Sequence, residues 1–364
     1  MKTLKQTNLT KEKSFRENLY KSEPYSPGEQ ISAPGLIKLN TNENPYPPSP
    51  KFMEYLGSFP DSEALRLYPD PDAEALKLCI ADSEGLDKEN IIVGNGSDEI
   101  LAFAFRAFFN GSKEVLFPDV TYSFYKVWCE LFDIPWAEIP VDENFRIRVS
   151  DYRRPNGGIV IANPNTPTGI GEDLDHIEEM LCNDSGSLLI VDEAYEMFSG
   201  MSAAPLLKKY DNLFITRTFS KAYSLAGVRL GAGFGSPELI NAIEAVRNSF
   251  NPYSVGCFGL RLGAAALKEK EYYKEQAGKI VKTRDNCAET LRALGFKVLD
   301  SRANFLFVSY PGLSGEYIYK SLKNRNILVR YFVLPRVKDW IRITVGTDEQ
   351  MDRLINSVKE IING

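Results

Sequence analysis

The chain alternates short apolar runs with longer segments in which apolar residues recur every three or four positions. Gly, Pro or Asn bounds each of the short runs. Short, continuously apolar runs of this kind are typical of strands that are covered on both faces of a sheet. The predicted strands cover residues 90–94, 114–118, 158–164, 187–193, 213–219 and 230–235.

Helix-like segments lie between these runs, for example over residues 97–109 and 173–183. Strands that alternate with helices indicate βαβ units and a sheet whose strands are mostly parallel. We therefore predict an α/β fold with a large domain over residues 46–254. This domain should have three layers, with helices on both sides of a mostly parallel, mixed sheet.

The pattern changes near residue 250. Residues 236–294 have a helical period that is interrupted only at 251–256. Four strand-like runs and one helix-like segment follow, so we predict a smaller α+β domain over residues 255–364.

Residues 1–45 are rich in Pro, Asn and Ser and oppose a long helix. We expect them to form an arm that packs near the small domain or a partner subunit.

Composition excludes several classes of protein. The 364 residues carry a formal charge of −6 and no run of Lys or Arg, which argues against nucleic-acid binding. No stretch approaches the ~20 apolar residues of a membrane span, and the first residues lack the apolar core of a secretory signal. The five cysteines are scattered without a C-x-x-C pair, which suits reduced thiols in a cytoplasmic enzyme and no metal site.

The chain has a single histidine, His176, at the polar start of a predicted helix. A Ser-His-Asp triad, a histidine metal site or histidine acid–base chemistry would each need this residue. Its polar surroundings favour a solvated surface position instead. We therefore expect proton transfer in this protein to use another group.

Three features follow predicted strands, where ligands bind in open α/β sheets. Ser97 opens a helix after a glycine turn, which could hold a phosphate or simply cap the helix. Tyr122 could lie over a flat cofactor or pack in the core. The loop "NPNTPTG" at residues 163–169 could present amides to a ligand or be an ordinary turn.

A carboxylate and an amine end two further strands. Asp192 ends an apolar run, which is costly unless a cation meets it, and Tyr195 follows three residues later. Ser220 and Lys221 end the next run, with Arg229 eight residues beyond Lys221. Burial and a nearby cation lower the pKa of a lysine meant to react as a neutral amine. Pyridoxal phosphate needs this set, because it requires an amine, a carboxylate at its ring nitrogen and anion donors.

The motifs "NPNTPTG", "VDEAY", "TFSKAYSLAGVRLG" and "IRITVGT" occur in this order. Together they resemble the fold-type I pyridoxal-phosphate-dependent aminotransferases (class I/II), and the subgroup they resemble most is the histidinol-phosphate aminotransferases. The resemblance runs from about residue 24 to residue 350. It implies an α/β enzyme that uses pyridoxal 5'-phosphate.

The resemblance also implies roles for single residues. Lys221 would bond covalently to the cofactor, Asp192 would pair with its ring nitrogen, and Tyr195 would donate to its phenolic oxygen. Tyr122 would stack on the ring. The groups that would hold the cofactor phosphate are Ser97 and Asp98, through backbone N–H groups, with Ser220 and Arg229.

Further residues match substrate and subunit contacts of that family. Arg342 matches an arginine that binds a substrate carboxylate or phosphate, and Tyr25 and Arg330 match additional substrate-phosphate contacts. Tyr68 matches a tyrosine that reaches the cofactor phosphate of the neighbouring subunit, which implies a homodimer. One position departs from the family pattern. Thr166 stands where the cofactor asparagine usually lies, and Asn165 or Asn163 would have to replace it.

The leading interpretation is an aminotransferase that exchanges an amino group between an anionic amino substrate and 2-oxoglutarate by a ping-pong mechanism. The substrate would be histidinol phosphate or an aromatic amino acid. One alternative is a decarboxylase of L-threonine-O-3-phosphate with the same fold. Another is a cofactor-binding module of a transcription regulator, although residues 1–24 are too short for a winged helix.

Overall fold

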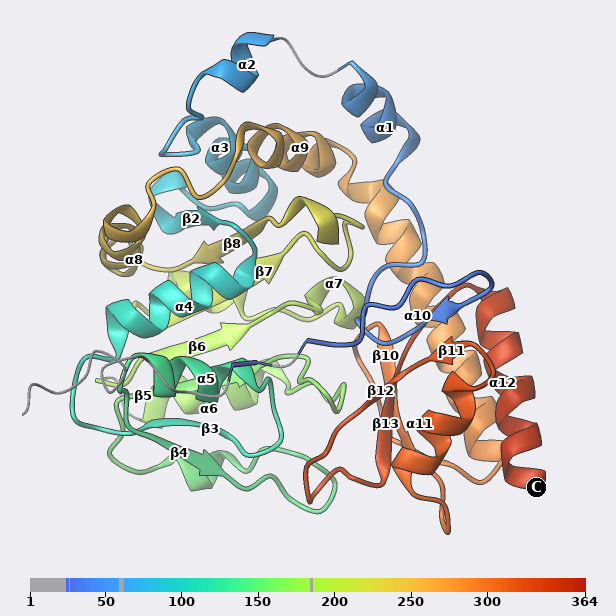
Figure 1. Ribbon diagram of the computed structural model, residues 1–364. Helices are drawn as coiled ribbons and strands as arrows, with labels where there is room; N and C mark the ends of the chain where they lie inside the picture. Colours follow the sequence, from blue (N-terminus) through green and yellow to red (C-terminus); the bar gives the residue numbers. More distant parts are fainter. Residues whose placement is uncertain (1–23, 26, 59–61, 184–185) are drawn as a thin grey trace, which may run out of the picture.

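The computed structural model describes residues 24–25, 27–58, 62–183 and 186–364. The first 23 residues of the predicted arm lie outside this range. The part of the arm that is described runs along the C-terminal part of the molecule (Figure 1). Its short strand β1 (Ile37–Lys38) pairs in parallel with β11 (Ile327–Leu328). Residues near the start of the chain therefore join an element close to its end.

A seven-stranded sheet forms the centre of the larger part. Strand β8 runs antiparallel to both of its neighbours, β2 and β7, and all the other pairs are parallel, so the predicted mostly parallel, mixed sheet is confirmed. In spatial order the strands are β2 (Ile91–Gly94), β8 (Gly231–Phe234), β7 (Leu213–Thr218), β6 (Leu189–Asp192), β5 (Gly158–Ala162), β3 (Val115–Pro118) and β4 (Trp136–Ile139).

Successive residues of a strand point to opposite faces of the sheet, and both faces are covered here. In β5, Ile159 and Ile161 join one apolar core, whereas Val160 and Ala162 join the other. Helices that contribute to the core around Ile159 are α3 (Glu74–Glu84), α6 (Leu174–Asn183) and α9 (Cys257–Lys268). Those on the other face are α4 (Ser97–Phe108), α5 (Phe124–Leu131) and α8 (Pro237–Phe250). The three predicted layers follow from this alternation.

The C-terminal part has a four-stranded antiparallel sheet in the order β12 (Arg330–Tyr331), β13 (Trp340–Thr344), β10 (Phe305–Ser309) and β9 (Lys297–Val298). Its core includes residues of α10 (Lys270–Ala293), α11 (Gly315–Lys323) and α12 (Asp348–Asn363). The single strand expected over 327–332 is divided, because β11 and β12 belong to different sheets. The predicted small α+β fold is otherwise as expected.

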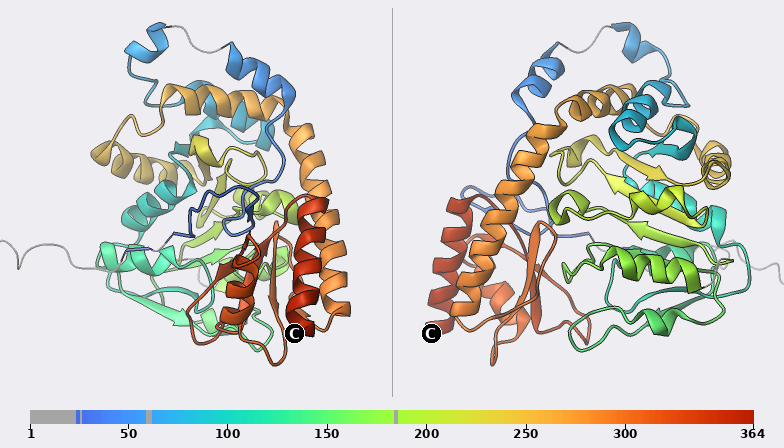
Figure 2. Two further views of the ribbon diagram at one scale, coloured as in Figure 1. Left: turned by 45° about the vertical axis from the view of Figure 1, so that its right-hand side comes forward. Right: turned by 180° about the vertical axis from the view of Figure 1, so that it is seen from behind.

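Helix α10 runs from the end of α9, beside the larger part, down along the C-terminal part of the molecule (Figure 2). Tyr273 near its start belongs to the large core, as do Leu262 and Ala266 of α9. Cys287 and Leu291 near its end belong to the C-terminal core. A domain boundary at residue 255 therefore stays a prediction.

The remaining elements are short. They are α1 (Pro50–Gly57), α2 (Ser62–Arg66), α7 (Glu196–Ser199) and the 3₁₀ turns η2 (Lys88–Asn90), η3 (Val149–Tyr152), η4 (Ala204–Lys208) and η5 (Ala226–Val228). Within the described residues, every helix is too short or too polar to cross a lipid bilayer.

Candidate active site

A cavity of about 260 Å³ lies where loops after the strands of the large sheet meet β12 and β13. It brings together all the residues that the sequence assigns to a site except Asn165 and Tyr68. Those that line it are Tyr25, Ser97, Asp98, Tyr122, Asp192, Tyr195, Ser220, Lys221, Arg229, Arg330 and Arg342. Residues at or after the ends of four strands (β2, β3, β6 and β7) therefore share one cavity with residues of the C-terminal sheet.

Lys221 follows β7 and extends into this cavity. Its Nζ donates a hydrogen bond to the backbone oxygen of Thr41 at 3.1 Å. Burial and then the nearby Arg342 guanidinium lower the pKa of Lys221 to about 8. The neutral amine that a nucleophile requires is thus far more populated near neutral pH than in an ordinary lysine.

Asp192 ends β6 and is only 5% exposed. Tyr125 donates to its Oδ2 at 3.2 Å, and Thr216 donates to its Oδ1 at 3.3 Å. Burial, and secondarily the charge of Asp98, raises the pKa of Asp192 to about 7. Among the described residues no Lys or Arg forms an ion pair with it. A protonated ring nitrogen would supply the missing positive charge.

The start of α4 forms a cradle of backbone atoms beside Arg229. Gly96 has φ +88°, and a Cβ there would lie 2.8 Å from Nη2 of Arg229. A Cβ on Gly231 would lie 2.5 Å from the backbone nitrogen of Ser97. Because both positions are glycine, the arginine and the first N–H groups of α4 remain close together. A phosphate fits this set of donors.

Two side chains hold Arg229 loosely at this cradle. Its Nη1 donates to Oγ of Ser220 and its Nη2 donates to Oδ2 of Asp98, each at 3.4 Å. Asp98 also accepts a hydrogen bond of 2.8 Å from the hydroxyl of Tyr122. Tyr122 packs edge-on against Tyr125 with ring centroids 5.7 Å apart, which fixes an aromatic ring at the cavity wall.

Tyr195 has a partner that sequence reasoning missed. Nδ2 of Asn42 donates to the hydroxyl oxygen of Tyr195 at 2.9 Å. Asn42 has φ +57°, a left-handed conformation that asparagine tolerates better than most residues. Thr344 donates to its Oδ1, and Asn304 donates to its backbone oxygen. The sequence shows an asparagine here in the Pro-rich arm. It does not show the partners of that asparagine, because they lie in distant elements.

Asn165, expected to contact the cofactor, does not line the cavity, so that contact stays a prediction. Its Nδ2 donates to the backbone oxygen of Val120 and to Thr168, and its Oδ1 accepts from Thr121 at 2.8 Å. The side chain is therefore used to brace its own loop. Asn163 is likewise bonded to the backbone of Glu172.

Thr166 lines the cavity in place of an asparagine. Its hydroxyl accepts a hydrogen bond of 3.0 Å from Nη1 of Arg342. The second guanidinium nitrogen of Arg342, Nη2, donates to the backbone oxygen of Asn40 at 3.1 Å. Its Nε is buried and has no hydrogen-bond partner within the described part of the chain. This arginine is thus held rigidly at the wall while one donor stays available.

A second cation stands beside Arg342. The Arg330 guanidinium lies 5.5 Å from the ring centroid of Phe332, and that ring lies equally far from the Arg342 guanidinium. Tyr25 stacks on Phe124 with ring centroids 4.1 Å apart and also lines the cavity. Two guanidinium groups and a tyrosine opposite Lys221 favour an anionic substrate.

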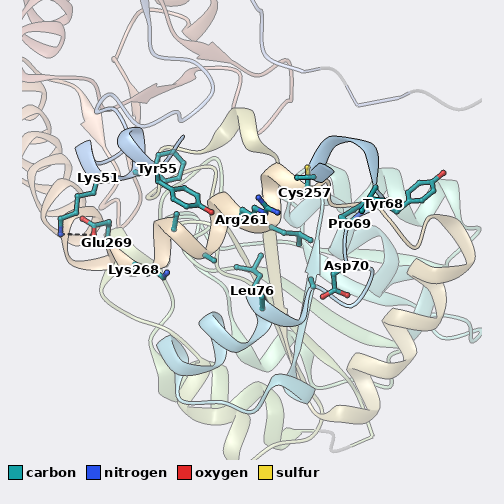
Figure 3. Close-up of a pocket in the computed structure, with 18 residues that line it drawn as sticks. Lys51, Tyr55, Tyr68, Pro69, Asp70, Leu76, Cys257, Arg261, Lys268 and Glu269 are labelled. Atoms are coloured by element: carbon teal, nitrogen blue, oxygen red, sulfur yellow. Dashed lines mark hydrogen bonds and ion pairs between the residues drawn. The ribbon is translucent and has the colours of Figure 1, made fainter. Parts of the chain in front are cut away.

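Tyr68 lies outside this cavity and is 80% exposed. It stacks on Tyr253 with ring centroids 4.5 Å apart. It borders a separate groove of about 640 Å³, at the opposite end from Tyr55 (Figure 3).

The only histidine, His176, is half-exposed and bonds to Glu172 through Nδ1 at 3.0 Å, so its predicted surface position is confirmed.

The fold and the cavity together define a pyridoxal-phosphate-dependent enzyme, because an activated lysine, a buried unpaired carboxylate and a phosphate cradle meet at strand ends of an α/β sheet. The sequence profile of the family "Aminotransferase class I and II" matches residues 34–358. The chain belongs to this family, and its cofactor is pyridoxal 5'-phosphate.

Similar proteins agree with this assignment. The histidinol-phosphate aminotransferase of Acinetobacter baylyi is 46% identical over 98% of this chain and 100% of its own length. That of Lactococcus lactis subsp. cremoris is 45% identical over 96% of this chain and 98% of its own. A crystal structure of histidinol-phosphate aminotransferase from Sinorhizobium meliloti with pyridoxal-5'-phosphate has the same fold, with a TM-score of 0.81 at 24% identity, covering 90% of this chain and 91% of that one.

Proposed function

We propose that this protein transfers the amino group of histidinol phosphate to 2-oxoglutarate. The main support is the identity of about 45% that extends over nearly the whole of two histidinol-phosphate aminotransferases. The cavity adds physical support, since Arg330 and Arg342 line it together with Lys221. Their charges suit a phosphate-bearing substrate and then a dicarboxylic acid.

Each cavity residue has a role in this proposal. When bound, pyridoxal phosphate supplies an aldehyde that combines with amines and a ring that accepts electrons. Arg229, Ser220 and the first N–H groups of α4 hold its phosphate. Asp192 would keep the ring nitrogen protonated, and Tyr122 would lie against the ring.

Lys221 carries out the proton transfer. Its neutral Nζ takes the proton from the substrate carbon that bears the amino group, which a pKa lowered to about 8 by burial permits. Tyr195, with its hydroxyl oriented by Asn42, donates to the phenolic oxygen of the cofactor. Arg330, Arg342 and Tyr25 bind the phosphate of the substrate and set its orientation.

A panel of amino donors with 2-oxoglutarate tests the reaction. Histidinol phosphate should be used with the highest kcat/KM, above phenylalanine and phosphothreonine, and Lys221→Ala should abolish both turnover and the visible absorbance of the bound cofactor. Release of carbon dioxide from phosphothreonine, without formation of a keto product, would instead identify a decarboxylase. Preference for phenylalanine would identify an aromatic transaminase.

We also propose that the active form is a homodimer. Exposed large apolar side chains line the Tyr68 groove, namely Tyr55, Leu67 and Tyr68 itself. Such a surface is typical of an interface. Tyr68 would extend from it to the cofactor phosphate in the partner subunit. The small domain, proposed as residues 255–364, would close over the large domain, proposed as residues 46–254. The reaction would take place in the cytoplasm, where free thiols such as those of Cys129 and Cys287 persist.

Mixing two inactive variants tests the shared site. Tyr68→Ala removes the contact that a subunit gives to its partner, whereas Lys221→Ala removes the amine of its own site. In a mixed dimer, the site that keeps Lys221 receives Tyr68 from the other chain, so activity should return on mixing. No recovery in a mixture that contains dimers would contradict a site completed by Tyr68.

A further inference from the structure

The two residues on which the chemistry depends lie at the ends of neighbouring strands: Asp192 is the last residue of β6, and Lys221 follows β7 by three residues. The strands are parallel neighbours, and Asp192 is paired in register with Thr216. Their side chains bond to each other on the face that meets the cavity. The next residues along the two strands, Glu193 and Arg217, therefore point to the opposite face.

Arg217 makes three directed hydrogen bonds on that opposite face. Its Nε donates to Oε2 of Glu193 at 2.9 Å, its Nη1 to Oε2 of Glu84 at 2.6 Å, and its Nη2 to Oγ of Ser202 at 2.7 Å. The side chain is 15% exposed. One guanidinium thus joins β7 to the end of β6, to α3 and to the loop after α7.

The partners of Arg217 are themselves fixed. The Glu193 side chain has no exposed surface and also accepts from the backbone N–H of Ala203 at 2.6 Å. Glu84 accepts from Nζ of Lys270, at the start of α10, at 3.0 Å. These residues do not line the cavity. The cluster is therefore a buried brace behind the site, and it makes no contact with a ligand there.

We propose that Arg217 is a positioning residue, which holds the ends of β6 and β7 at the separation that places Asp192 and Lys221 on one cofactor. A salt bridge across the back of two neighbouring strands opposes both sliding and splaying of their ends. Asp192 lies one residue before Glu193, and Lys221 lies four residues after Arg217, so each of the two residues is within four positions of a residue of the brace. The inference rests on the roles proposed for Asp192 and Lys221.

Conservative substitutions separate positioning from folding. Arg217→Lys keeps the positive charge. It replaces the three donor nitrogens of the guanidinium group by one ammonium nitrogen, which cannot reach all three partners. Glu193→Gln keeps the shape and loses the charge. Lys77→Met is a matched control, because Lys77 forms a largely buried ion pair with Glu244 at 2.5 Å between α3 and α8, away from the cavity.

The measurements are the Kd of the apoenzyme for pyridoxal phosphate, the pH midpoint of the visible absorbance of the bound cofactor, and Tm. Arg217→Lys should raise the Kd at least tenfold and move the midpoint by at least half a pH unit. Its kcat should fall about tenfold with KM within a factor of two. Lys77→Met should lower Tm while leaving the Kd and the midpoint at wild-type values.

Two results would overturn the proposal. One is an Arg217→Lys protein with lower Tm but unchanged Kd and midpoint, since this would match the control and indicate a purely structural role. If that variant does not fold, Glu193→Gln decides, and a Kd within a factor of two of wild type overturns the proposal. Cofactor affinity and absorbance do not depend on the amino donor, so a failure of the proposed substrate would leave this test intact.

Discussion

The side-chain amide of Asn42 donates a hydrogen bond of 2.9 Å to the hydroxyl oxygen of Tyr195, although 153 positions separate the two residues. The bond joins the N-terminal arm to the loop after β6. Asn42 is in turn fixed by Thr344 in β13. A proposed cofactor contact therefore depends on three segments that are far apart in the chain.

Asn42→Ala should destabilise the protein and weaken cofactor binding together. Loss of the amide leaves the Tyr195 and Thr344 hydroxyls short of a partner, which costs about 1–3 kcal/mol in a buried site. Urea unfolding and a cofactor titration measure the two effects. Asn286→Ala, at an exposed position of α10, is the control and should change stability by less than about 0.5 kcal/mol. Wild-type stability for Asn42→Ala would show that the bond contributes little.

Asp192→Asn should inactivate the enzyme yet stabilise the apoprotein at alkaline pH. Burial raises the pKa of Asp192 to about 7 from an ordinary 3.8. Between pH 3.8 and 7 the carboxyl group is therefore protonated in the folded chain but ionised in the unfolded chain. The contribution of Asp192 to the free energy of unfolding is fully present below about pH 4, where the carboxyl group is protonated in both states. It is lost as the pH rises through 7 and the buried carboxyl group ionises. A neutral amide avoids that loss.

The expected gain for the Asp192→Asn apoprotein at pH 8 is on the order of 2–4 kcal/mol, shrinking towards pH 5. Activity should fall at least ~100-fold, since the ring nitrogen loses its counter-charge. The stability change is measured as Tm at pH 5, 6.5 and 8, and the loss of activity is measured as kcat. Asp300→Asn, whose side chain is 83% exposed, should show neither change. Equal Tm differences at all three pH values would contradict a titrating Asp192.

Arg342→Met should raise the pKa of Lys221. After burial, the Arg342 charge is the main cause that lowers this pKa to about 8. The rate at which the apoenzyme combines with pyridoxal phosphate depends on the neutral amine, so its pH inflection should lie near 8 in the wild type and move upward by roughly 1 unit in the variant. Arg336→Met removes a cation that pairs with Asp119 outside the cavity, and its inflection should stay near 8. An unmoved inflection in Arg342→Met would assign the shift to burial alone.

Gly231→Ala should weaken cofactor binding at least tenfold. Its Cβ would lie 2.5 Å from the backbone nitrogen of Ser97, so the first turn of α4 must move away from Arg229. Overpacking of this kind costs about 1–3 kcal/mol. Gly278→Ala in α10 is the control, because no atom lies within 4 Å of the added methyl group and a helical alanine stabilises by ~0.5–1 kcal/mol. Wild-type cofactor affinity in Gly231→Ala would argue against a phosphate at this cradle.

Much of the fold could be predicted because its strands are buried on both faces. All six strands expected before residue 250 are present, and the five parallel ones among them (β2, β3, β5, β6 and β7) end at or shortly before a polar residue of the cavity. Strand β4 was missed, since Trp136–Ile139 is a half-buried edge strand with a glutamate in the middle. The division of residues 327–332 into β11 and β12 was also missed, because pairing partners are not visible in a local pattern.

The predicted site residues that follow a strand directly do line one cavity, and their roles stay predictions. Asp192 and Lys221 could be found because polar groups at buried strand ends are costly without a purpose. Asn42, Thr216 and Tyr125 were missed, since they act only through contacts made in the folded chain. Asn165 does not line the cavity, because a loop sequence does not reveal which side chain faces it, and its contact with the cofactor stays a prediction.

By itself, the order of apolar and polar positions determined the layered sheet and the strand ends at which chemistry could occur, because burial of a strand depends on neighbouring residues in the chain. Only the tertiary structure decided which groups meet Asp192, Tyr195 and Lys221 and how far their pKa values move. Those outcomes depend on burial and on charges such as Arg342, which reach the site from elements more than a hundred residues away. Long-range contact of this kind leaves no periodic trace in the sequence.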